Sequence, residues 1–358
     1  MKTICYEGFL GGPRSMGRVG NYLVSHLLST GRYKVYFSPC DSDYMTDRWR
    51  KEIRDIILRN PGSKDIDQSI DFCSVHDARR PRSAKCMSTY FYYELNSLPK
   101  KIVEDINSND QVYVCSSFIH KTFLREGVTA PITVLGHGFD PKFYTPTKRL
   151  RGKEFTFLCV AEHTPRKNLP ILIRCFERAF QNVKDARLVL KLGLHGEGDI
   201  RHYITKPAMV STYRRRTLSE TSLADLYKSA HCFVLPTRAE GFGMPILEAM
   251  ATGMPVIVTN YSGHLDFCTD ENSFLIANKG LVDSSMDCFP NIKSQWGDPD
   301  PDHLISLMRW VYDNYDRALE VGGKAQEQIH AHWTWKQQLS ASFPQSRVLS
   351  HGAAAGGL

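Results

Sequence analysis

The sequence predicts an α/β protein with two domains, and three observations lead to this prediction. The chain has 358 residues, which is more than one hydrophobic core usually supports and about right for two domains. Short apolar runs typical of strands alternate with amphipathic stretches typical of helices along most of the chain. A polar, basic stretch at residues 147–153 (TKRLRGK) interrupts this alternation near its middle. We therefore expect one domain over residues 1–148, a second over 149–330, and a final helix with a flexible tail over 331–358.

The composition is that of a soluble globular protein, with 42% hydrophobic and 23% charged residues. No apolar run has the length of a signal peptide or of a membrane span, and the ten cysteines are scattered without CxxC pairs. We therefore expect a cytoplasmic protein with reduced cysteines and no zinc site. The net charge of +7 suits an anionic small molecule, an anionic membrane surface or a nucleic acid. Because no tract interleaves aromatic and basic residues, we do not expect a nucleic-acid partner.

The first domain begins with a strand-like run at residues 2–7, followed by a glycine-rich loop at residues 8–20 that leads into a helix. The loop contains Gly11 and Gly12, and Arg18 either adds positive charge there or is an exposed arginine. Its glycines do not follow G-x-G-x-x-G and no acidic residue ends a second strand, so a dinucleotide-dependent dehydrogenase is disfavoured. The further elements expected in this domain are strands over 34–38, 66–75, 90–93, 111–116 and 132–135, and helices over 41–60 and 117–126.

Residues 87–99 (MSTYFYYELNSLP) are the most unusual segment of the first domain. They predict a strand that runs straight into Glu94. This places the Glu94 carboxylate at the carboxyl end of a strand, where open α/β sheets bind their ligands. Aromatic residues at strand spacing belong to a core more often than to a site, so the tyrosines of this segment are expected to be mainly structural.

The second domain begins with an apolar strand over residues 155–160. Arg166 and Lys167 then stand just before a helix that Asn168 is expected to cap. Because the positive end of a helix dipole does not favour cations, an anion beside these two residues is the simplest explanation of their position. The further strands expected here are over 187–192, 231–235, 255–259 and 274–276, and residues 281–296 are expected to be irregular. Helices are expected to start at Ser219 or Thr221, near Pro245 and near 298–302, and a last helix is expected over 324–339.

Residues 231–268 contain the most specific pattern in the chain: a strand, a glycine-bearing loop, a helix and a second strand. Such a loop exposes backbone N–H groups at the positive end of the helix dipole, which suits phosphate. Glu240 lies in the loop, and Glu248 follows it in the helix, eight residues later. Carboxylates repel phosphate but accept hydrogen bonds from hydroxyl groups. Phosphate donors beside hydroxyl acceptors predict a nucleotide-sugar pocket; the alternative is a solvated loop and a helix with one exposed glutamate.

The run EGFGMPILEAMATGMPVIV at residues 240–258 resembles the motif of retaining glycosyltransferases of family 4 (glycosyl transferases group 1), in which seven residues separate two glutamates. The resemblance implies the GT-B fold, in which two Rossmann-like domains face each other across a cleft and the C-terminal helix crosses back to the first domain. It implies that the first domain binds the acceptor and the second binds the donor. Glu248 would hold the ribose hydroxyls and Glu240 would face the donor sugar. The other donor contacts that it implies are the backbone amides of Gly241, Phe242, Gly243 and Met244, the cations Lys167 and Arg166, and the loop glycines Gly11 and Gly12.

Two departures from the family pattern change the expected contacts. Glu162 stands where relatives commonly have an arginine, so either the nearby arginine substitutes for it or the diphosphate is bound more weakly. The segment ending at Glu94 lacks the histidine that contacts the donor sugar in many relatives, so Glu94, Tyr92 or Tyr93 is expected to replace it. His137 lies in the segment that resembles the family's approach to the interdomain cleft, and it is a further candidate contact for sugar or acceptor.

The resemblance implies an enzyme that moves a hexosyl or pentosyl group from a UDP- or GDP-linked donor to a hydroxyl of a glycan, glycolipid or other acceptor. Retention implies front-face attack by the acceptor, with Lys167 and Glu240 as the catalytic residues. No metal-binding clamp of the other glycosyltransferase fold is evident, so no metal or other cofactor is expected. A lipid-linked acceptor would bring a peripheral membrane contact. The alternatives are a sugar phosphorylase or epimerase of the same fold, and a protein that binds nucleotide sugars without turnover.

Overall fold

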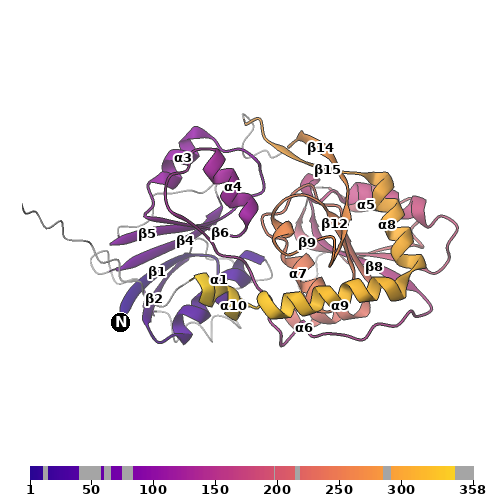
Figure 1. Ribbon diagram of the computed structural model, residues 1–358, viewed down its shortest axis with the longest axis horizontal. Helices are drawn as coiled ribbons and strands as arrows, with labels where there is room; N and C mark the ends of the chain where they lie inside the picture. The colour runs from indigo at the N-terminus through magenta and orange to yellow at the C-terminus, as the bar shows by residue number, and fades with distance from the viewer. Residues whose placement is uncertain are drawn as a thin grey trace, which may run out of the picture.

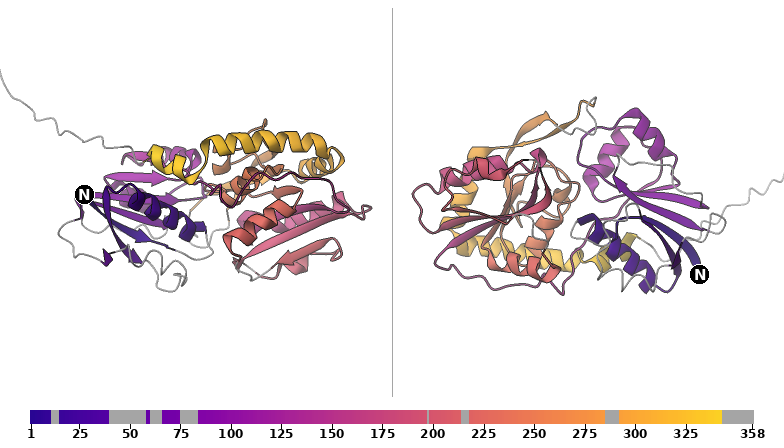
Figure 2. Two further views of the ribbon diagram at one scale, coloured as in Figure 1. Left: turned by 90° about the horizontal axis from the view of Figure 1, so that it is seen from below. Right: turned by 180° about the vertical axis from the view of Figure 1, so that it is seen from behind.

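The structure, a computed structural model, describes residues 1–10, 15–39, 58–59, 66–74, 84–196, 198–213, 218–284 and 292–342. In this part of the chain two parallel sheets lie side by side, each flanked by helices (Figure 1). The view from below and the view from behind both show the two sheets as separate bodies joined by the chain and by the C-terminal helices (Figure 2). The predicted α/β architecture with two similar domains is confirmed.

The first sheet has seven described strands in the order β3-β2-β1-β4-β5-β6-β7, and every neighbouring pair is parallel. The strands are β1 (Lys2–Gly8), β2 (Tyr33–Pro39), β3 (Leu58–Arg59), β4 (Gln68–Ser74), β5 (Cys86–Tyr92), β6 (Gln111–Val114) and β7 (Ile132–Val134). Its described helices are α1 (Ser15–Ser29), α3 (Lys100–Asn107) and α4 (Ser117–Arg125). The strand order reverses between β1 and β4. Open α/β sheets bind ligands outside the carboxyl ends of the strands at such a reversal.

The second sheet has six described strands in the order β10-β9-β8-β11-β12-β13, again all parallel. The strands are β8 (Phe155–His163), β9 (Ala186–Gly196), β10 (Val210–Tyr213), β11 (Cys232–Leu235), β12 (Val256–Thr259) and β13 (Phe274–Ile276). The helical elements are η3 (Pro165–Lys167), α5 (Leu169–Ala179), η4 (Ile200–Tyr203), α6 (Glu220–Ser229), α7 (Met244–Ala251), η5 (Gly263–Asp266) and α8 (Pro301–Asp313). Here the order reverses between β8 and β11, so the loops after these two strands lie next to each other.

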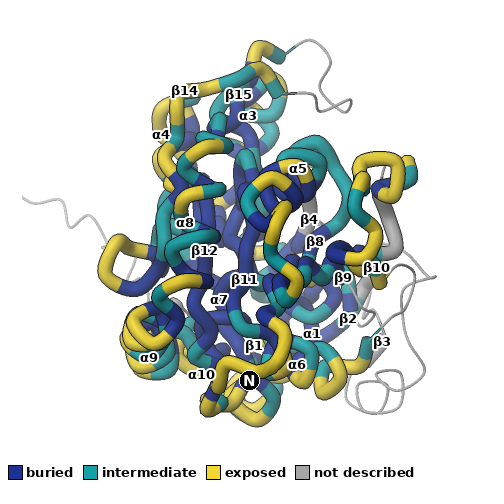
Figure 3. Tube along the Cα trace, turned by 90° about the vertical axis from the view of Figure 1, so that its right-hand side faces the viewer, coloured by how far each residue is buried: buried dark blue, intermediate teal, exposed yellow. Residues whose placement is uncertain are grey.

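The core explains why the central strands are continuous apolar runs. Every residue of β11 and of β12 is buried, as expected for parallel strands that are covered on both faces. The tube coloured by burial shows the buried residues along the strands and the exposed ones on the outer helices and turns (Figure 3). The cysteines whose side chains the structure describes are free thiols, namely Cys5, Cys86, Cys115, Cys159, Cys175, Cys232 and Cys268. Within that same part of the chain, no helix is both long enough and apolar enough to cross a membrane.

The C-terminal helices cross from the second domain to the first, as predicted. Helix α9 (Tyr315–His332) runs along the second domain, and α10 (Trp335–Ser342) lies beside α1 (Figure 1). The rings of Tyr22 and Trp335 are stacked with centroids 4.8 Å apart. The Phe139 N–H donates to the Trp333 carbonyl at 3.1 Å, which ties the end of the first domain to the crossing point. The helix expected from residue 324 in fact begins at Tyr315.

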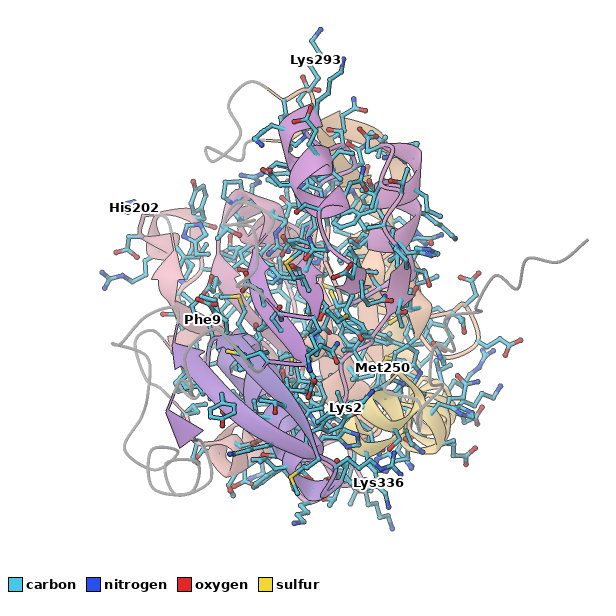
Figure 4. The ribbon with its side chains drawn as sticks, turned by 90° about the vertical axis from the view of Figure 1, so that its left-hand side faces the viewer. Lys2, Phe9, His202, Met250, Lys293 and Lys336 are labelled. Atoms are coloured by element: carbon cyan, nitrogen blue, oxygen red, sulfur yellow. The ribbon has the colours of Figure 1, made fainter. Side chains whose placement is uncertain are left out.

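The excursion expected over residues 281–296 is in part a hairpin. Strands β14 (Asn278–Asp283) and β15 (Gln295–Pro299) pair antiparallel. The hairpin also contacts the first domain, where the Asn96 side-chain oxygen accepts from the Gln295 N–H at 2.8 Å. Lys293, just before β15, projects from the end of the molecule (Figure 4). The hairpin therefore links the segment that follows Glu94 to the second domain.

Three local predictions have different outcomes: one is wrong, one lies mostly outside the described residues, and one is confirmed. Asn168 precedes α5 with a left-handed φ of 58°, but its side chain makes no capping hydrogen bond. The helix expected over 41–60 lies outside the described residues except for 58–59, which form β3 instead. Of the two candidate caps, Ser219 is the one that caps α6, accepting from the Ser222 N–H at 3.1 Å.

Candidate functional site

A cleft of about 430 Å³ lies where the two domains meet. It is formed at the carboxyl ends of the strands that flank both order reversals. From the first domain it is lined by residues that include Arg18, Tyr92, Glu94, Cys115 and His137. From the second domain it is lined by residues that include Glu162, Arg166, Lys167, Lys191, Glu240, Gly241, Phe242, Gly243, Met244 and Glu248. The chain thus brings together nearly all of the described residues that the sequence predicted for the site.

The loop before α7 is held by close backbone contacts. The Glu240 N–H donates to Ser262 Oγ at 2.7 Å, and the Gly263 N–H donates to the Glu240 carbonyl at 2.9 Å. A Cβ at Gly263 would stand 2.1 Å from the Gly241 carbonyl oxygen, so no larger residue fits there. Gly243 has a φ of 98° and directly precedes α7, and Pro245 lies in the first turn as predicted. The loop therefore presents its backbone at a fixed position at the positive end of the helix.

Glu240 and Lys167 form a buried ion pair on the wall of the cleft. Lys167 Nζ lies 2.5 Å from Glu240 Oε1, and the two residues are 9% and 5% exposed. Burial works to raise the pKa of Glu240, but Lys167 and Arg166 outweigh it and hold the pKa at about 2. Burial lowers the pKa of the Lys167 ammonium, and Glu240 opposes this effect. The Glu240 carboxylate is therefore charged throughout the physiological pH range.

Arg166 joins the two domains through a second carboxylate. Its Nη2 lies 3.1 Å from Glu94 Oε1 of the first domain, and its Nη1 lies 3.5 Å from Glu240 Oε2. The Arg166 guanidinium also donates to the Ala239 carbonyl at 2.6 Å. The anion that the sequence predicted beside Arg166 and Lys167 is thus supplied by the protein itself, as Glu94 and Glu240. These two carboxylates account for the position of the cations, and binding of a diphosphate beside them stays a prediction.

Glu248 lies deeper in the cleft and is paired across the domain boundary. It is 1% exposed, and Arg18 Nη2 of α1 lies 2.7 Å from its Oε1. The same nitrogen lies 3.0 Å from Glu220 Oε1 and donates to the Tyr144 hydroxyl at 3.2 Å. Burial raises the pKa of Glu248, while Arg18 opposes that rise. The sequence predicts Arg18 either as added positive charge or as an exposed arginine. Its side chain is 15% exposed, so the second alternative is wrong.

His137 and Tyr93, two candidate contacts, are placed very differently. His137 lines the cleft at 6% exposure, and its ring lies 4.8 Å from the Phe242 ring. Burial lowers the pKa of His137 to about 3, so the ring is neutral at physiological pH. Tyr93 is in the core of the first domain, where its hydroxyl donates to the Ser97 carbonyl and its ring packs on Phe123. The expected contact by Tyr93 is therefore corrected: Tyr92 lines the cleft and Tyr93 does not.

The remaining predicted positions are Gly11, Gly12 and Glu162. Gly11 and Gly12 lie outside the described residues. Glu162 lines the cleft and packs against Gly193, where a Cβ would come within 2.5 Å of the Glu162 side chain. Among the described residues, no three His, Cys, Asp or Glu side chains are grouped so that they could hold a metal ion.

The second domain matches a known protein family. Residues 154–287 match the family model described as glycosyl transferases group 1. An uncharacterized glycosyltransferase of Methanocaldococcus jannaschii is 30% identical over 149 residues, which cover 40% of this chain and 37% of the relative. The sulfoquinovosyl transferase SQD2 of Arabidopsis thaliana is 24% identical over 246 residues, which cover 64% of this chain and 46% of the relative. The chain thus spans less than half the length of these two relatives.

The fold of the whole chain also matches solved structures. The Anabaena protein HepE, solved in complex with UDP and glucose, superposes with a TM-score of 0.66 at 13% sequence identity. The match covers 95% of this chain and 98% of that protein. At this level of identity the likeness shows the fold and nothing further. Residues 154–287 are thus similar to the glycosyl transferases group 1 family, and the chain as a whole has the two-domain GT-B fold.

Proposed function

We propose that this protein is a retaining glycosyltransferase of family 4. It would move a hexosyl or pentosyl group from a UDP- or GDP-linked sugar to a hydroxyl of a glycan, a glycolipid or another acceptor. The observation that carries the proposal is the placement of Glu240 and Glu248 on either side of the start of α7, with Lys167 against Glu240, all in one interdomain cleft. The names of the relatives, and the UDP and glucose bound to HepE, support the same chemistry.

The roles of the cleft residues follow from what each can donate or accept. Glu248 is an acceptor for the ribose hydroxyls, and Glu240 is an acceptor for a hydroxyl of the donor sugar. The ammonium of Lys167 has three donors, and its contact with Glu240 leaves others for phosphate oxygens. The amides of residues 241–244 at the start of α7 add a site for the diphosphate. Glu94 and His137 line the same cleft, which supports the proposal that they contact the sugar or the acceptor.

Bond breaking in this reaction leaves negative charge on the departing diphosphate. Lys167 and Arg166 are held in place before the reaction by their carboxylate partners, so they can stabilise that charge without reorganising. In the front-face mechanism, the acceptor hydroxyl attacks C1 on the side from which the diphosphate leaves. Its proton passes to a phosphate oxygen, and Glu240 orients the sugar. We propose that no metal is required, because these two cations would stabilise the negative charge of the leaving diphosphate in place of a metal ion.

The test is a panel of UDP- and GDP-linked sugars, with released nucleotide as the readout for wild-type protein and for Glu240→Gln. We expect at least one donor to be turned over by the wild type and turnover by Glu240→Gln to be at least 100-fold slower. Turnover should be unchanged in EDTA, and a loss in EDTA that Mg²⁺ restores would disprove metal independence. If every donor is inert and donor binding by Glu240→Gln equals that of the wild type, the proposal fails.

One observation favours a second candidate, a protein that binds nucleotide sugars without turnover. Arg166 and Lys167 already have carboxylate partners, and Glu162 adds a further carboxylate to the cleft. This arrangement leaves less positive charge for a diphosphate than two free cations would. Binding of UDP or GDP together with no release of nucleotide from any sugar in the panel would favour this candidate.

A further inference from the structure

We infer that Arg18, a residue of the first domain, completes the nucleotide site of the second domain by holding the Glu248 carboxylate charged and oriented. The inference rests on the proposed function, because it takes the ribose of a nucleotide as the ligand of Glu248. Arg18 acts through Glu248 and is therefore a positioning residue.

The geometry places Arg18 as the cation that serves Glu248. Arg18 Nη2 lies 2.7 Å from Glu248 Oε1, and the two side chains are 15% and 2% exposed. Within the described ranges, no other lysine or arginine forms an ion pair with Glu248. Because α1 and α7 belong to different domains, this pair forms only when the two domains are together (Figure 1).

Apart from Arg18, the main features around Glu248 disfavour the ionised form of its carboxyl group. Burial is the largest effect on its pKa and raises it, and the nearby Glu220 of α6 raises it further. Arg18 and the Tyr227 hydroxyl act in the opposite direction. Tyr144 also lies close, as the acceptor of an Arg18 hydrogen bond. Without the guanidinium, burial and Glu220 would raise the pKa of this carboxyl group further, so it would keep its proton to a higher pH.

Protonation of Glu248 would change what it offers to a ribose. An ionised carboxylate accepts hydrogen bonds at both oxygens, whereas a protonated carboxyl group keeps a proton on one of them. Two adjacent hydroxyl groups are donors, so they match the ionised form better. Loss of Arg18 should therefore weaken nucleotide binding most at low pH. The loss should shrink as the pH rises and Glu248 ionises again.

The experiment measures the binding of UDP and GDP to the full chain by calorimetry between pH 6 and pH 9. The variants are Arg18→Met, Arg18→Lys, Glu248→Gln and the double variant Arg18→Met/Glu248→Gln. Arg187→Met is the matched control, because Arg187 pairs with Glu154 outside the cleft. We expect Arg18→Met to bind UDP or GDP about tenfold more weakly at neutral pH, because one hydrogen bond between the ribose and the charged Glu248 would be lost. Its affinity should recover at high pH. Arg18→Lys should bind with little dependence on pH, and the double variant should bind like Glu248→Gln.

Three results would overturn the inference. If Arg18→Met binds UDP or GDP as tightly as the wild type, the binding role of Glu248 does not depend on Arg18. A loss that is equal at every pH and persists in the Glu248→Gln background would show that Arg18 contacts the nucleotide or only holds the domains together. A loss of the same size in Arg187→Met would show a general charge effect. Wild-type protein that binds neither UDP nor GDP would instead overturn the proposed function, and this inference with it.

Discussion

Replacing Lys167 with methionine separates the two tasks that the cleft assigns to this residue. Lys167 pairs with Glu240 at 2.5 Å in the folded protein, and in the proposed reaction it stabilises the leaving diphosphate. The substitution keeps an apolar stem of similar length and removes only the charge. It should therefore reduce both the free energy of unfolding and the rate of glycosyl transfer, and each loss can be measured separately.

The loss of stability follows from the pKa of Glu240. Its carboxyl pKa falls from the usual 4.5 to about 2 in the folded protein. A depressed pKa contributes stability that is present above pH 4.5 and is lost as the pH falls through about 2. At about 1.4 kcal/mol per pH unit, and with Arg166 supplying part of the effect, Lys167→Met should cost about 2–3 kcal/mol at neutral pH. The difference in melting temperature between variant and wild type should therefore narrow below pH 5.

The loss of activity follows from the charge on the leaving group. Removing one preorganised donor to such a charge typically slows turnover about 10²–10³-fold. Released nucleotide at saturating donor measures this rate, and differential scanning fluorimetry measures the melting temperature. Lys101→Met is the control, because Lys101 pairs with Asp105 on an exposed helix face.

A double variant tests the assignment most sharply. In Lys167→Met/Glu240→Gln, residue 240 is a neutral amide, so no unpaired charge is buried. The melting temperature should therefore recover toward that of the wild type, while turnover should stay low. If the double variant also regained activity, Lys167 would serve only to balance the charge of Glu240. Turnover by Lys167→Met within threefold of wild type would also refute its role at the leaving group.

Two further predictions concern the loop and the interdomain ion pair. Gly263→Ala should lower both the melting temperature and the affinity for UDP or GDP, because its Cβ would stand 2.1 Å from a backbone oxygen of the loop. Gly323→Ala is the matched control, because a Cβ there meets nothing within 4 Å. Equal effects of the two substitutions would contradict the close contact of Gly263 with the loop backbone. Glu94→Gln should bind UDP or GDP severalfold more tightly, because it removes one of the two carboxylate partners of Arg166 and with it a negative charge near the proposed diphosphate site. Asp105→Asn should leave this affinity unchanged, and weaker binding by Glu94→Gln would show that Glu94 itself contacts the nucleotide.

The part of the site that the sequence predicts well is the part built from local structure. Gly243 needs a positive φ before α7, Pro245 suits a first helical turn, and the fully apolar β11 and β12 are typical of buried parallel strands. These signals lie within one short segment of the chain. They are enough to place Glu240 at the start of a helix and Glu248 within it.

The contacts between domains have no such local signal. Arg18 and Glu248, or Glu94 and Arg166, meet only because two sheets face each other, and residue type and spacing do not select one partner among many. The choice between Tyr92 and Tyr93 depends on which face of the strand end turns toward the cleft, which an all-aromatic run does not reveal.

The β14–β15 hairpin has only a weak signal in the sequence. Its strands are short and carry mainly polar or exposed residues, so the alternation of apolar and polar positions that marks a strand is weak. A segment of this kind is recognised by its pairing partner, and that partner is known only once the chain has folded.

The most direct test of glycosyl transfer in this cleft is to follow C1 of a labelled donor by NMR during turnover. The donor is the UDP- or GDP-linked sugar that the panel identifies as active, and Glu240→Gln is the control. We predict that nucleotide release is accompanied by a sugar product with the same anomeric configuration as the donor, and that both signals are lost in Glu240→Gln. A product of inverted configuration would contradict the retaining mechanism, and turnover that survives in Glu240→Gln would contradict the role of this cleft.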